Sequence, residues 1–240
     1  MMMKAMIFAA GLGTRLKPWT DKHPKALAVV NGKTLLQRNI EYLQRAGIYD
    51  VIVNVHHFAD QVISDIERFD GWGSRITISN ETDAVLETGG GLKKAAWYFE
   101  GEEDFVVMNA DILTDMDLAA MIRQHLSGEA LATLATSDRT SSRYFLFNEG
   151  GLLCGWENVK TGEQKIVRDE RPLHQQAFSG VHVIDTAIFP LMVQEGKFSM
   201  VDVYLTVALL NSVQAFNHTG ATFIDVGKPE SLEKAEALFP

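Results

Sequence analysis

The sequence predicts an α/β protein with a Rossmann-like, mixed and mostly parallel central sheet flanked by helices, and a small antiparallel subsheet. In the first half, short apolar runs alternate with amphipathic segments of helical period. This alternation is typical of a parallel sheet that helices cover on both faces. In the second half, short strand-like pieces separated by turn residues predict antiparallel pairing. No linker, repeat or low-complexity stretch separates the halves, so we expect one domain over residues 1–240, divided at about residue 128.

The first half supplies the parallel part of the predicted sheet. Residues 5–9, Ala-Met-Ile-Phe-Ala, are a continuous apolar run, as expected for a strand buried on both faces. Thr34 is a suitable N-cap for a helix, and Gly47 lies where the C-terminal glycine of that helix is expected. The further strands are predicted over residues 51–55, 75–79 and 105–108, and the further helices over residues 59–69, 89–99 and 118–126.

The second half predicts shorter elements. The four strand-like pieces of the antiparallel subsheet are expected over residues 130–135, 144–147, 152–156 and 164–168. A strong strand over residues 177–184 follows, then helices over residues 186–193 and 201–210 and a last strand over residues 222–226. Pro229 opens a terminal helix, because proline fits the first helical turn.

Composition excludes several classes of protein. With 46% hydrophobic and 22% charged residues, the chain has the composition of an ordinary soluble globular protein. A formal net charge of -9 argues against a general nucleic-acid-binding surface, and no apolar run is long enough to span a membrane. The single cysteine, Cys154, excludes an internal disulfide and a multi-cysteine zinc site. We therefore expect a cytoplasmic protein with no nucleic-acid or membrane partner.

A glycine-rich loop follows the first strand. Gly11 and Gly13 allow backbone N–H groups to approach an anion closely, and Arg15, Lys17 and Lys25 add positive charge. An arginine fork can hold two phosphate oxygens at once. The loop therefore predicts a polyphosphate-binding site at the end of the first strand.

Two common phosphate-binding motifs do not fit this loop. A P-loop requires G-x-x-x-x-G-K-[ST], and no Lys-Ser/Thr pair follows Gly11 or Gly13 at that offset. A dinucleotide fingerprint requires a third glycine where Leu16 stands, and Pro18 interrupts the helix that should begin there. A bare G-x-G can also be a tight exit from a strand, but the clustered cations favour an anion site.

Two aspartates follow apolar strands. Asp111 comes directly after the strand over residues 105–108, at the edge where open α/β sheets bind ligands. Asp225 lies at the end of the strand over residues 222–226, before a glycine turn. Each could also cap a helix or form an ordinary turn. A two-carboxylate magnesium site gathers its ligands from different strand ends, so the two aspartates together are a candidate pair.

Residues 86–91, Leu-Glu-Thr-Gly-Gly-Gly, are a second candidate binding segment. The glycines are expected to leave N–H groups facing outward at the positive end of the helix over residues 89–99. Glu87 provides an acceptor for hydroxyl groups. A flexible loop with a helix cap is the alternative, for which three consecutive glycines carry a large entropy cost.

Residues 11–27 resemble the signature of the sugar-1-phosphate nucleotidyltransferases, G-x-G-T-R-[LM]-x-P-x-T followed by P-K-x-L. The E-T-G-G-G segment is similar to that of the short members that act as N-acetylmuramate-1-phosphate uridylyltransferases or mannose-1-phosphate guanylyltransferases. The resemblance implies a nucleotidyltransferase fold in which residues 1–128 bind nucleotide and residues 129–240 bind sugar. It implies Mg²⁺-dependent transfer of a nucleoside monophosphate from an NTP to a sugar 1-phosphate, releasing pyrophosphate.

The resemblance also implies the roles of individual residues. Arg15, Lys25 and Asp111 are the catalytic residues, with Arg15 on the leaving pyrophosphate, and Asp111 and Asp225 are the magnesium ligands. Nucleotide contacts are expected from Ala10, Gly11, Leu12, Gly13, Thr14, Arg15, Asn80 and Asn109. Sugar-phosphate contacts are expected from Lys25, Glu87, Thr88, Gly89, Glu170, Arg171, Ser179 and Gly180. The chain departs from the family pattern at Ala110, where glycine is usual, and at Arg171, where the E-K-P motif has lysine.

Several alternatives stay open at this point. UTP with N-acetylmuramate 1-phosphate is the favoured substrate pair, and mannose-1-phosphate guanylyltransferase or another hexose-1-phosphate nucleotidyltransferase is the next. A cytidylyltransferase for an alcohol phosphate such as phosphocholine shares the loop. A non-catalytic relative is a further alternative, but such a protein would have lost the cations and aspartates that this chain keeps. A dinucleotide-binding oxidoreductase is disfavoured by Leu16 and Pro18. The sequence predicts neither the base nor the sugar nor the oligomeric state.

Overall fold

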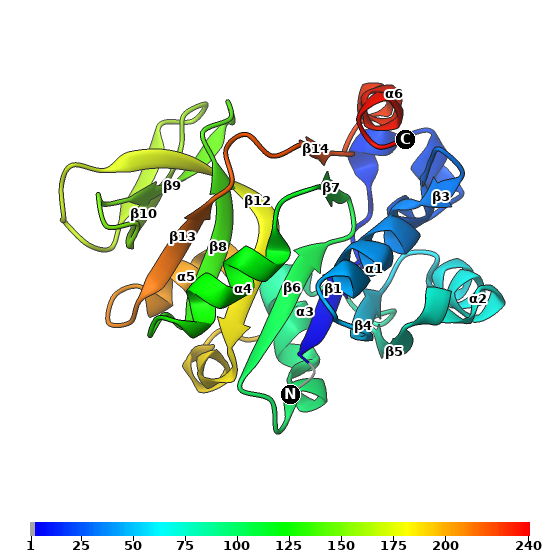
Figure 1. The fold of residues 1–240 in the computed structure, drawn as a ribbon, viewed down its shortest axis with the longest axis horizontal. Helices are drawn as coiled ribbons and strands as arrows, with labels where there is room; N and C mark the ends of the chain where they lie inside the picture. The colour runs from blue at the N-terminus through cyan, green and yellow to red at the C-terminus, as the bar shows by residue number, and fades with distance from the viewer. Residues whose placement is uncertain (1–2) are drawn as a thin grey trace.

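The computed structural model describes residues 3–240 and contains one large mixed sheet with helices on both of its faces (Figure 1). Four neighbouring strands run parallel: β5 (Arg75–Asn80), β4 (Asp50–Val55), β1 (Lys4–Phe8) and β6 (Asp104–Asn109). The long strand β12 (His174–Asp185) runs antiparallel to β6 and continues the sheet into the second half of the chain. The mixed, mostly parallel sheet expected from the sequence is confirmed.

The second half extends this sheet in two directions. β8 (Ala132–Ser137) pairs antiparallel with the main part of β12, and β13 (Val213–Asn217) pairs parallel with β8. The start of β12 instead pairs with β9 (Arg143–Phe147), which continues antiparallel into β10 (Leu153–Asn158) and β11 (Glu163–Ile166). These last three strands form the predicted antiparallel subsheet, of which Figure 1 labels β9 and β10. The fourth predicted piece, β8, is not part of it, because β8 pairs with the main part of β12 and with β13.

The side chains of β1 alternate between two hydrophobic clusters. Ala5 and Ile7 pack on one face with α1 (Leu35–Arg45), α2 (Ala59–Arg68) and α4 (Leu118–Leu126). Met6 and Phe8 pack on the other face with α3 (Glu87–Lys94) and α5 (Met200–Val207). Because both faces are covered, the middle residues of these strands are mostly apolar, which is the pattern that the sequence showed.

Most of the predicted elements are confirmed, and the differences are informative. The helix over residues 118–126 is found with those bounds, and Thr34 caps α1 by accepting the Gln37 N–H. Residues 186–191 form a 3₁₀ turn instead of an α-helix, and α5 ends at Val207, earlier than expected. β8 begins two residues later than predicted. β13 was missed, because it is a short segment, Val-Gln-Ala-Phe-Asn, in which only Val213 is fully buried and no clear apolar pattern is present.

The prediction for the glycine triplet is wrong. α3 begins at Glu87, so Gly89, Gly90 and Gly91 lie inside the helix and are buried. The N–H groups of Gly89 and Gly90 donate to the Phe198 carbonyl oxygen at 2.9 and 3.3 Å. The glycines are needed because the helix packs too closely against its surroundings for side chains to fit: a Cβ on Gly90 would overlap the Gly196 carbonyl oxygen.

We expect Gly90→Ala to lower the free energy of unfolding by roughly 2 kcal/mol, because a methyl group would force α3 away from the backbone of Gly196. Gly128→Ala is the matched control, since a Cβ there meets only ordinary van der Waals contacts. Urea denaturation of both variants measures the difference. Equal stability of the two variants would show that α3 is not held by this close contact.

A small separate sheet brings the C-terminal segment to the end of β6. β7 (Ile112–Thr114) pairs antiparallel with β14 (Phe223–Asp225), and the two lie side by side in Figure 1. The Asp115 carboxylate accepts the N–H and hydroxyl of Thr222, both at 2.7 Å. α6 (Pro229–Leu238) follows, with the predicted proline in its first turn. This pairing places the residues after β6 beside the end of β14.

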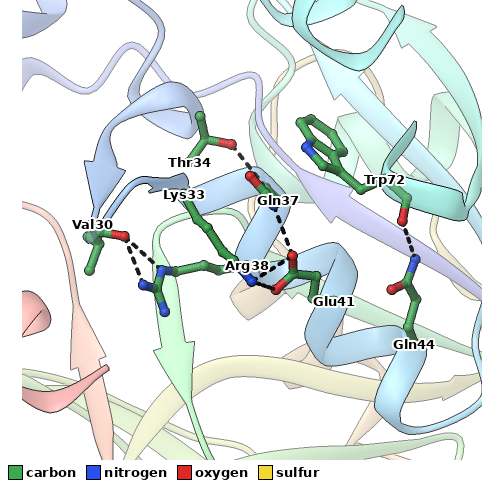
Figure 2. A network of polar contacts seen from close by, with 8 residues as sticks. All are labelled: Val30, Lys33, Thr34, Gln37, Arg38, Glu41, Gln44 and Trp72. Carbon is green, nitrogen blue, oxygen red and sulfur yellow. Dashed lines mark hydrogen bonds and ion pairs between the residues drawn. The ribbon is translucent and has the colours of Figure 1, made fainter. Parts of the chain in front are cut away.

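A polar network fixes the N-terminal half of α1 (Figure 2). Lys33, in the short hairpin of β2 (Val29–Val30) and β3 (Lys33–Thr34), donates to both Glu41 carboxylate oxygens at 2.9 and 2.7 Å. Arg38 donates twice to the Val30 carbonyl oxygen. α1 in turn carries the buried Asn39, whose amide donates at 2.8 Å to the carbonyl oxygen of Ala110. The network therefore anchors the helix that supports the segment after β6.

Within residues 3–240, none of the helices combines the length and apolar character that crossing a membrane requires.

Candidate active site

The carboxyl ends of three parallel strands are level with one another. Phe8, the last residue of β1, pairs in register with Asn54 on one side and Asn109 on the other. A cavity of about 590 Å³ lies over this edge of the sheet. Its lining comes from the β1 loop, the ends of β4 and β6, the start of α3 and the second half of the chain: Phe8, Ala9, Ala10, Gly11, Leu12, Gly13, Thr14, Lys25, Ala26, Asn54, Val85, Glu87, Thr88, Asn109, Ala110, Asp111, Arg143, Lys197 and Ser199.

The glycine-rich loop folds back on itself and brings Lys25 to the cavity. Gly13 has a φ of +61°, and a Cβ there would lie 2.8 Å from Thr20 Cγ2 and 3.0 Å from Lys25 Cβ. The Thr20 hydroxyl donates to the Gly13 carbonyl oxygen at 2.9 Å. Glycine is thus required at this position both for its conformation and for the close approach.

Two aspartates and two cations converge where the loop meets the end of β6. The Lys25 ammonium forms an ion pair with Asp111 Oδ2 and lies 4.0 Å from Asp225 Oδ1. Arg15 Nη2 lies 3.7 Å from Asp225 Oδ2. The backbone keeps the two aspartates together, because the Val226 N–H donates to the Asp111 carbonyl oxygen at 2.9 Å.

The donor set fits a magnesium ion. Burial raises the pKa of the Asp225 carboxyl, and the negative charge of Asp111 raises it further, against the opposing effect of Lys25. Asp225 Oδ1 is buried and has no hydrogen-bond partner among the described residues. Carboxylate oxygens are preferred Mg²⁺ ligands, and Mg²⁺ in phosphate-transfer sites takes one or two carboxylates with substrate phosphates and water. No group of three His, Cys, Asp or Glu side chains in residues 3–240 could hold a metal, so this pair would need such additional ligands.

Arg139 adds positive charge near Asp225 from the second half of the chain. Its guanidinium donates to the Phe178 carbonyl oxygen at 2.6 Å and lies 4.7 Å from the centre of the Phe223 ring. Burial lowers the pKa of Arg139, whereas the charge of Asp225 raises it. Arg139 therefore links β12 to β14, which carries one of the two candidate metal ligands.

A family model described as nucleotidyl transferase matches residues 4–239. The chain belongs to the nucleotidyl transferase family. Its match to the N-acetylmuramate alpha-1-phosphate uridylyltransferase of Caulobacter vibrioides is 44% identical but covers only 45% of each chain. The enzyme of that name from Neisseria meningitidis is 28% identical over 98% of both chains. The D-glycero-alpha-D-manno-heptose 1-phosphate guanylyltransferase of Aneurinibacillus thermoaerophilus is 29% identical over 98% of this chain and 97% of that one.

The fold is also found in solved structures. HddC from Yersinia pseudotuberculosis superposes with a TM-score of 0.81 at 26% identity, with both chains covered completely. The same protein has been solved in complex with GMP-PN. The nucleotidyltransferase fold and family expected from the β1 loop are therefore confirmed.

Most of the nucleotide-binding residues predicted for this nucleotidyl transferase line the cavity: Ala10, Gly11, Leu12, Gly13, Thr14 and Asn109. Arg15 instead lines an adjoining cavity of about 370 Å³ with Asp225 and the start of α6. Asn80 lines neither cavity, and its side-chain oxygen accepts the Thr82 N–H at 2.8 Å. Lys17, the third cation predicted for the site, lines neither cavity and pairs with Asp21 at 2.9 Å.

The predicted sugar-phosphate residues divide into two groups. Lys25, Glu87 and Thr88 line the cavity, and Lys197 pairs with Glu87 at 3.3 Å. Gly89 does not, because it is buried within α3 and its N–H is already bonded to Phe198.

The four predicted residues of the second half lie outside the cavity lining. Glu170 accepts from the Asn148 amide at 2.7 Å, and Arg171 pairs with Asp169 at 3.0 Å. Ser179 is buried against His218, with 2.8 Å between Oγ and Nε2. Gly180 packs against the Asn109 side chain, since a Cβ on Gly180 would lie 2.7 Å from the Asn109 amide nitrogen.

Sequence reasoning missed several residues at the cavity, namely Asn54, Arg143, Lys197 and Ser199, and the neighbouring Arg139. Asn54 carried a usable signal, because it is a polar residue within the apolar run Val-Ile-Val-Asn-Val of β4. Such a side chain needs a partner when buried. The other four carried no local signal, since only the tertiary fold brings their segments to the β1 edge.

Proposed function

We propose that this nucleotidyl transferase moves a nucleoside monophosphate from an NTP to a sugar 1-phosphate, forming a nucleotide-sugar and pyrophosphate. The observation that carries the proposal is the placement of Lys25 between Asp111 and Asp225, directly beside a glycine-rich loop over the cavity. That arrangement combines a glycine-rich loop suited to phosphate, a cation and two carboxylates that can act as hard oxygen ligands. Phosphoryl and nucleotidyl transfer depend on these parts, because catalysis rests on positioning and charge neutralisation.

We assign the following roles to individual residues. The loop from Ala10 to Thr14 holds the nucleotide over the cavity through its backbone N–H groups. Lys25 neutralises charge where the sugar phosphate approaches the α-phosphorus, and Arg15 neutralises charge on the departing pyrophosphate. The adjoining cavity beside Arg15 offers the pyrophosphate a place outside the main cavity. No covalent intermediate is required, because the attacking phosphate oxygen is already ionised.

Asp111 and Asp225 would hold Mg²⁺, completed by substrate phosphates and water. The bound ion would neutralise charge that develops on the α-phosphate oxygens. The two aspartates come from segments far apart in the sequence, so correct pairing of β7 with β14 is a condition for holding the ion.

We favour UTP and N-acetylmuramate 1-phosphate as the substrates. The full-length similarity to the Neisseria uridylyltransferase supports this pair. GTP with mannose 1-phosphate or a related sugar 1-phosphate is the second candidate, favoured by the similar identity to the Aneurinibacillus guanylyltransferase and by the GMP-PN complex of HddC.

A matrix of four nucleotides against several sugar 1-phosphates, scored by pyrophosphate release, tests the proposal. UTP, GTP, CTP and dTTP would each be offered with N-acetylmuramate, mannose and glucose 1-phosphates and with phosphocholine. We expect the highest kcat/KM with UTP and N-acetylmuramate 1-phosphate. A preference for GTP with mannose 1-phosphate would establish the second candidate, and turnover restricted to CTP with phosphocholine would contradict a sugar-phosphate acceptor.

A further inference from the structure

Asn54 is a buried polar residue whose side-chain oxygen is bonded to the start of the nucleotide loop. It is 2% exposed and lies in β4 opposite Phe8, the last residue of β1. Its side-chain oxygen accepts the Ala9 N–H at 2.7 Å and the Ala10 N–H at 3.3 Å. These are the two residues through which the chain leaves the strand and enters the loop.

Glu81 fixes the orientation of this amide. The Asn54 side-chain nitrogen donates to Glu81 Oε1 at 2.8 Å, which turns the opposite side of the amide, its oxygen, toward Ala9. Glu81 is 1% exposed, and its backbone N–H donates to the Val55 carbonyl oxygen at 2.8 Å. Burial raises the pKa of the Glu81 carboxyl, against the hydrogen bond from Asn54.

α3 packs directly over this pair. A Cβ on Gly91 would lie 2.8 Å from Glu81 Oε1 and 2.9 Å from the Asn54 amide nitrogen. The third glycine of the triplet therefore has a specific function in the packing: it leaves room for the pair beneath the helix. The pair, the helix and the loop entrance are consequently in direct contact.

We propose that Asn54 is a positioning residue for the nucleotide loop, with Glu81 as the group that sets the direction of its amide. The proposal rests on the proposed function, since it assumes that the loop binds the phosphates of an NTP. Asn54 fixes the direction in which the chain leaves β1, and so fixes the position of Gly11 to Thr14 over the cavity. Loss of the acceptor would weaken phosphate binding without removing any group that contacts substrate.

Two double variants separate this role from simple core packing. Asn54→Leu/Glu81→Leu replaces both polar side chains with apolar ones, so that neither is left buried without a partner. Asn54→Asp/Glu81→Gln reverses the polarity of the pair: the introduced carboxylate still accepts from Ala9 and Ala10, and the introduced amide donates to it. Thr133→Val is the matched control, because Thr133 is a buried strand residue bonded to His125 and away from the cavity lining.

The measurements are KM for NTP, kcat, KM for sugar 1-phosphate, and the inhibition constant of inorganic tripolyphosphate, which has no base. We expect the double leucine variant to raise KM for NTP and the tripolyphosphate constant about tenfold, with KM for sugar 1-phosphate within about twofold. The reversed pair should restore both constants to within about threefold of wild type. Thr133→Val should change stability alone.

Hydrogen exchange at Ala9 and Ala10 gives a reading that does not depend on substrate. We expect protection of these N–H groups in the wild type and the reversed pair, and its loss in the double leucine variant. Unchanged exchange and an unchanged tripolyphosphate constant in the double leucine variant would overturn the proposal. If the double leucine variant fails to fold, a reversed pair with wild-type stability but a tenfold higher tripolyphosphate constant would overturn it. A wild-type protein that makes no nucleotide-sugar yet shows the expected exchange pattern would contradict only the proposed function.

Discussion

Asp111→Asn and Asp225→Asn should each lower kcat/KM for nucleotide-sugar formation by about 10³-fold, equivalent to roughly 4 kcal/mol of transition-state stabilisation. Each change keeps the shape of the side chain but removes one of the two carboxylates that converge beside Lys25. The neutral amide is a poor Mg²⁺ ligand, so the lost activity should not be recovered by excess NTP. Steady-state kinetics over a range of Mg²⁺ concentrations measures the effect.

Asp21→Asn is the control for these variants. Asp21 is an exposed carboxylate in the same loop region, paired with Lys17. Its replacement should leave kcat/KM within about twofold of wild type, because surface ion pairs contribute little. An Asp225→Asn protein with near wild-type activity would show that catalysis does not require both aspartates.

Lys25→Met should have two opposite effects. Turnover should fall by roughly 10²-fold to 10³-fold, because the ammonium that neutralises charge between the substrates is lost. The free protein should nevertheless bind Mn²⁺, used as a spectroscopic substitute for Mg²⁺, about tenfold more tightly. The reason is that the Lys25 ammonium pairs with Asp111 and lies 4.0 Å from Asp225, where it competes with a cation for the same oxygens.

Electron paramagnetic resonance of free Mn²⁺ measures this competition without turnover. Lys22→Met is the control, since Lys22 is an exposed lysine of the same segment. It should alter neither Mn²⁺ affinity nor kcat. A Lys25→Met protein that binds Mn²⁺ no more tightly than wild type would mean that the ammonium does not share the site of the metal.

The local parts of the fold could be predicted from the sequence. The apolar run of β1 and the periodic pattern of residues 118–126 report burial directly, so these elements are found close to their predicted bounds. The loop could be predicted for the same reason, because glycines and cations act within one short segment. Asp111 and Asp225 were recognisable as strand-end carboxylates, and the β7–β14 pairing brings them together.

Residues whose role depends on tertiary contact could not be predicted this way. The glycine triplet has the composition of a phosphate-binding helix end, but its glycines lie inside α3. Glycine is needed there because Phe198, Gly196 and Glu81 pack too closely against the helix for side chains to fit. Glu170 and Arg171 match a short motif, yet each is held by a neighbour outside the cavity lining. A motif of two residues carries no information about the direction in which a connecting segment runs.

³¹P NMR of the reaction itself tests the proposed nucleotidyl transfer most directly. Wild-type protein would be incubated with Mg²⁺, UTP and N-acetylmuramate 1-phosphate, with GTP and mannose 1-phosphate in a second sample, and with EDTA in matched controls. We expect equal amounts of a nucleotide-sugar diphosphate and pyrophosphate in at least one sample, and neither product with EDTA. Release of inorganic phosphate or nucleoside monophosphate without a nucleotide-sugar, or formation of the nucleotide-sugar at the same rate in EDTA, would contradict it.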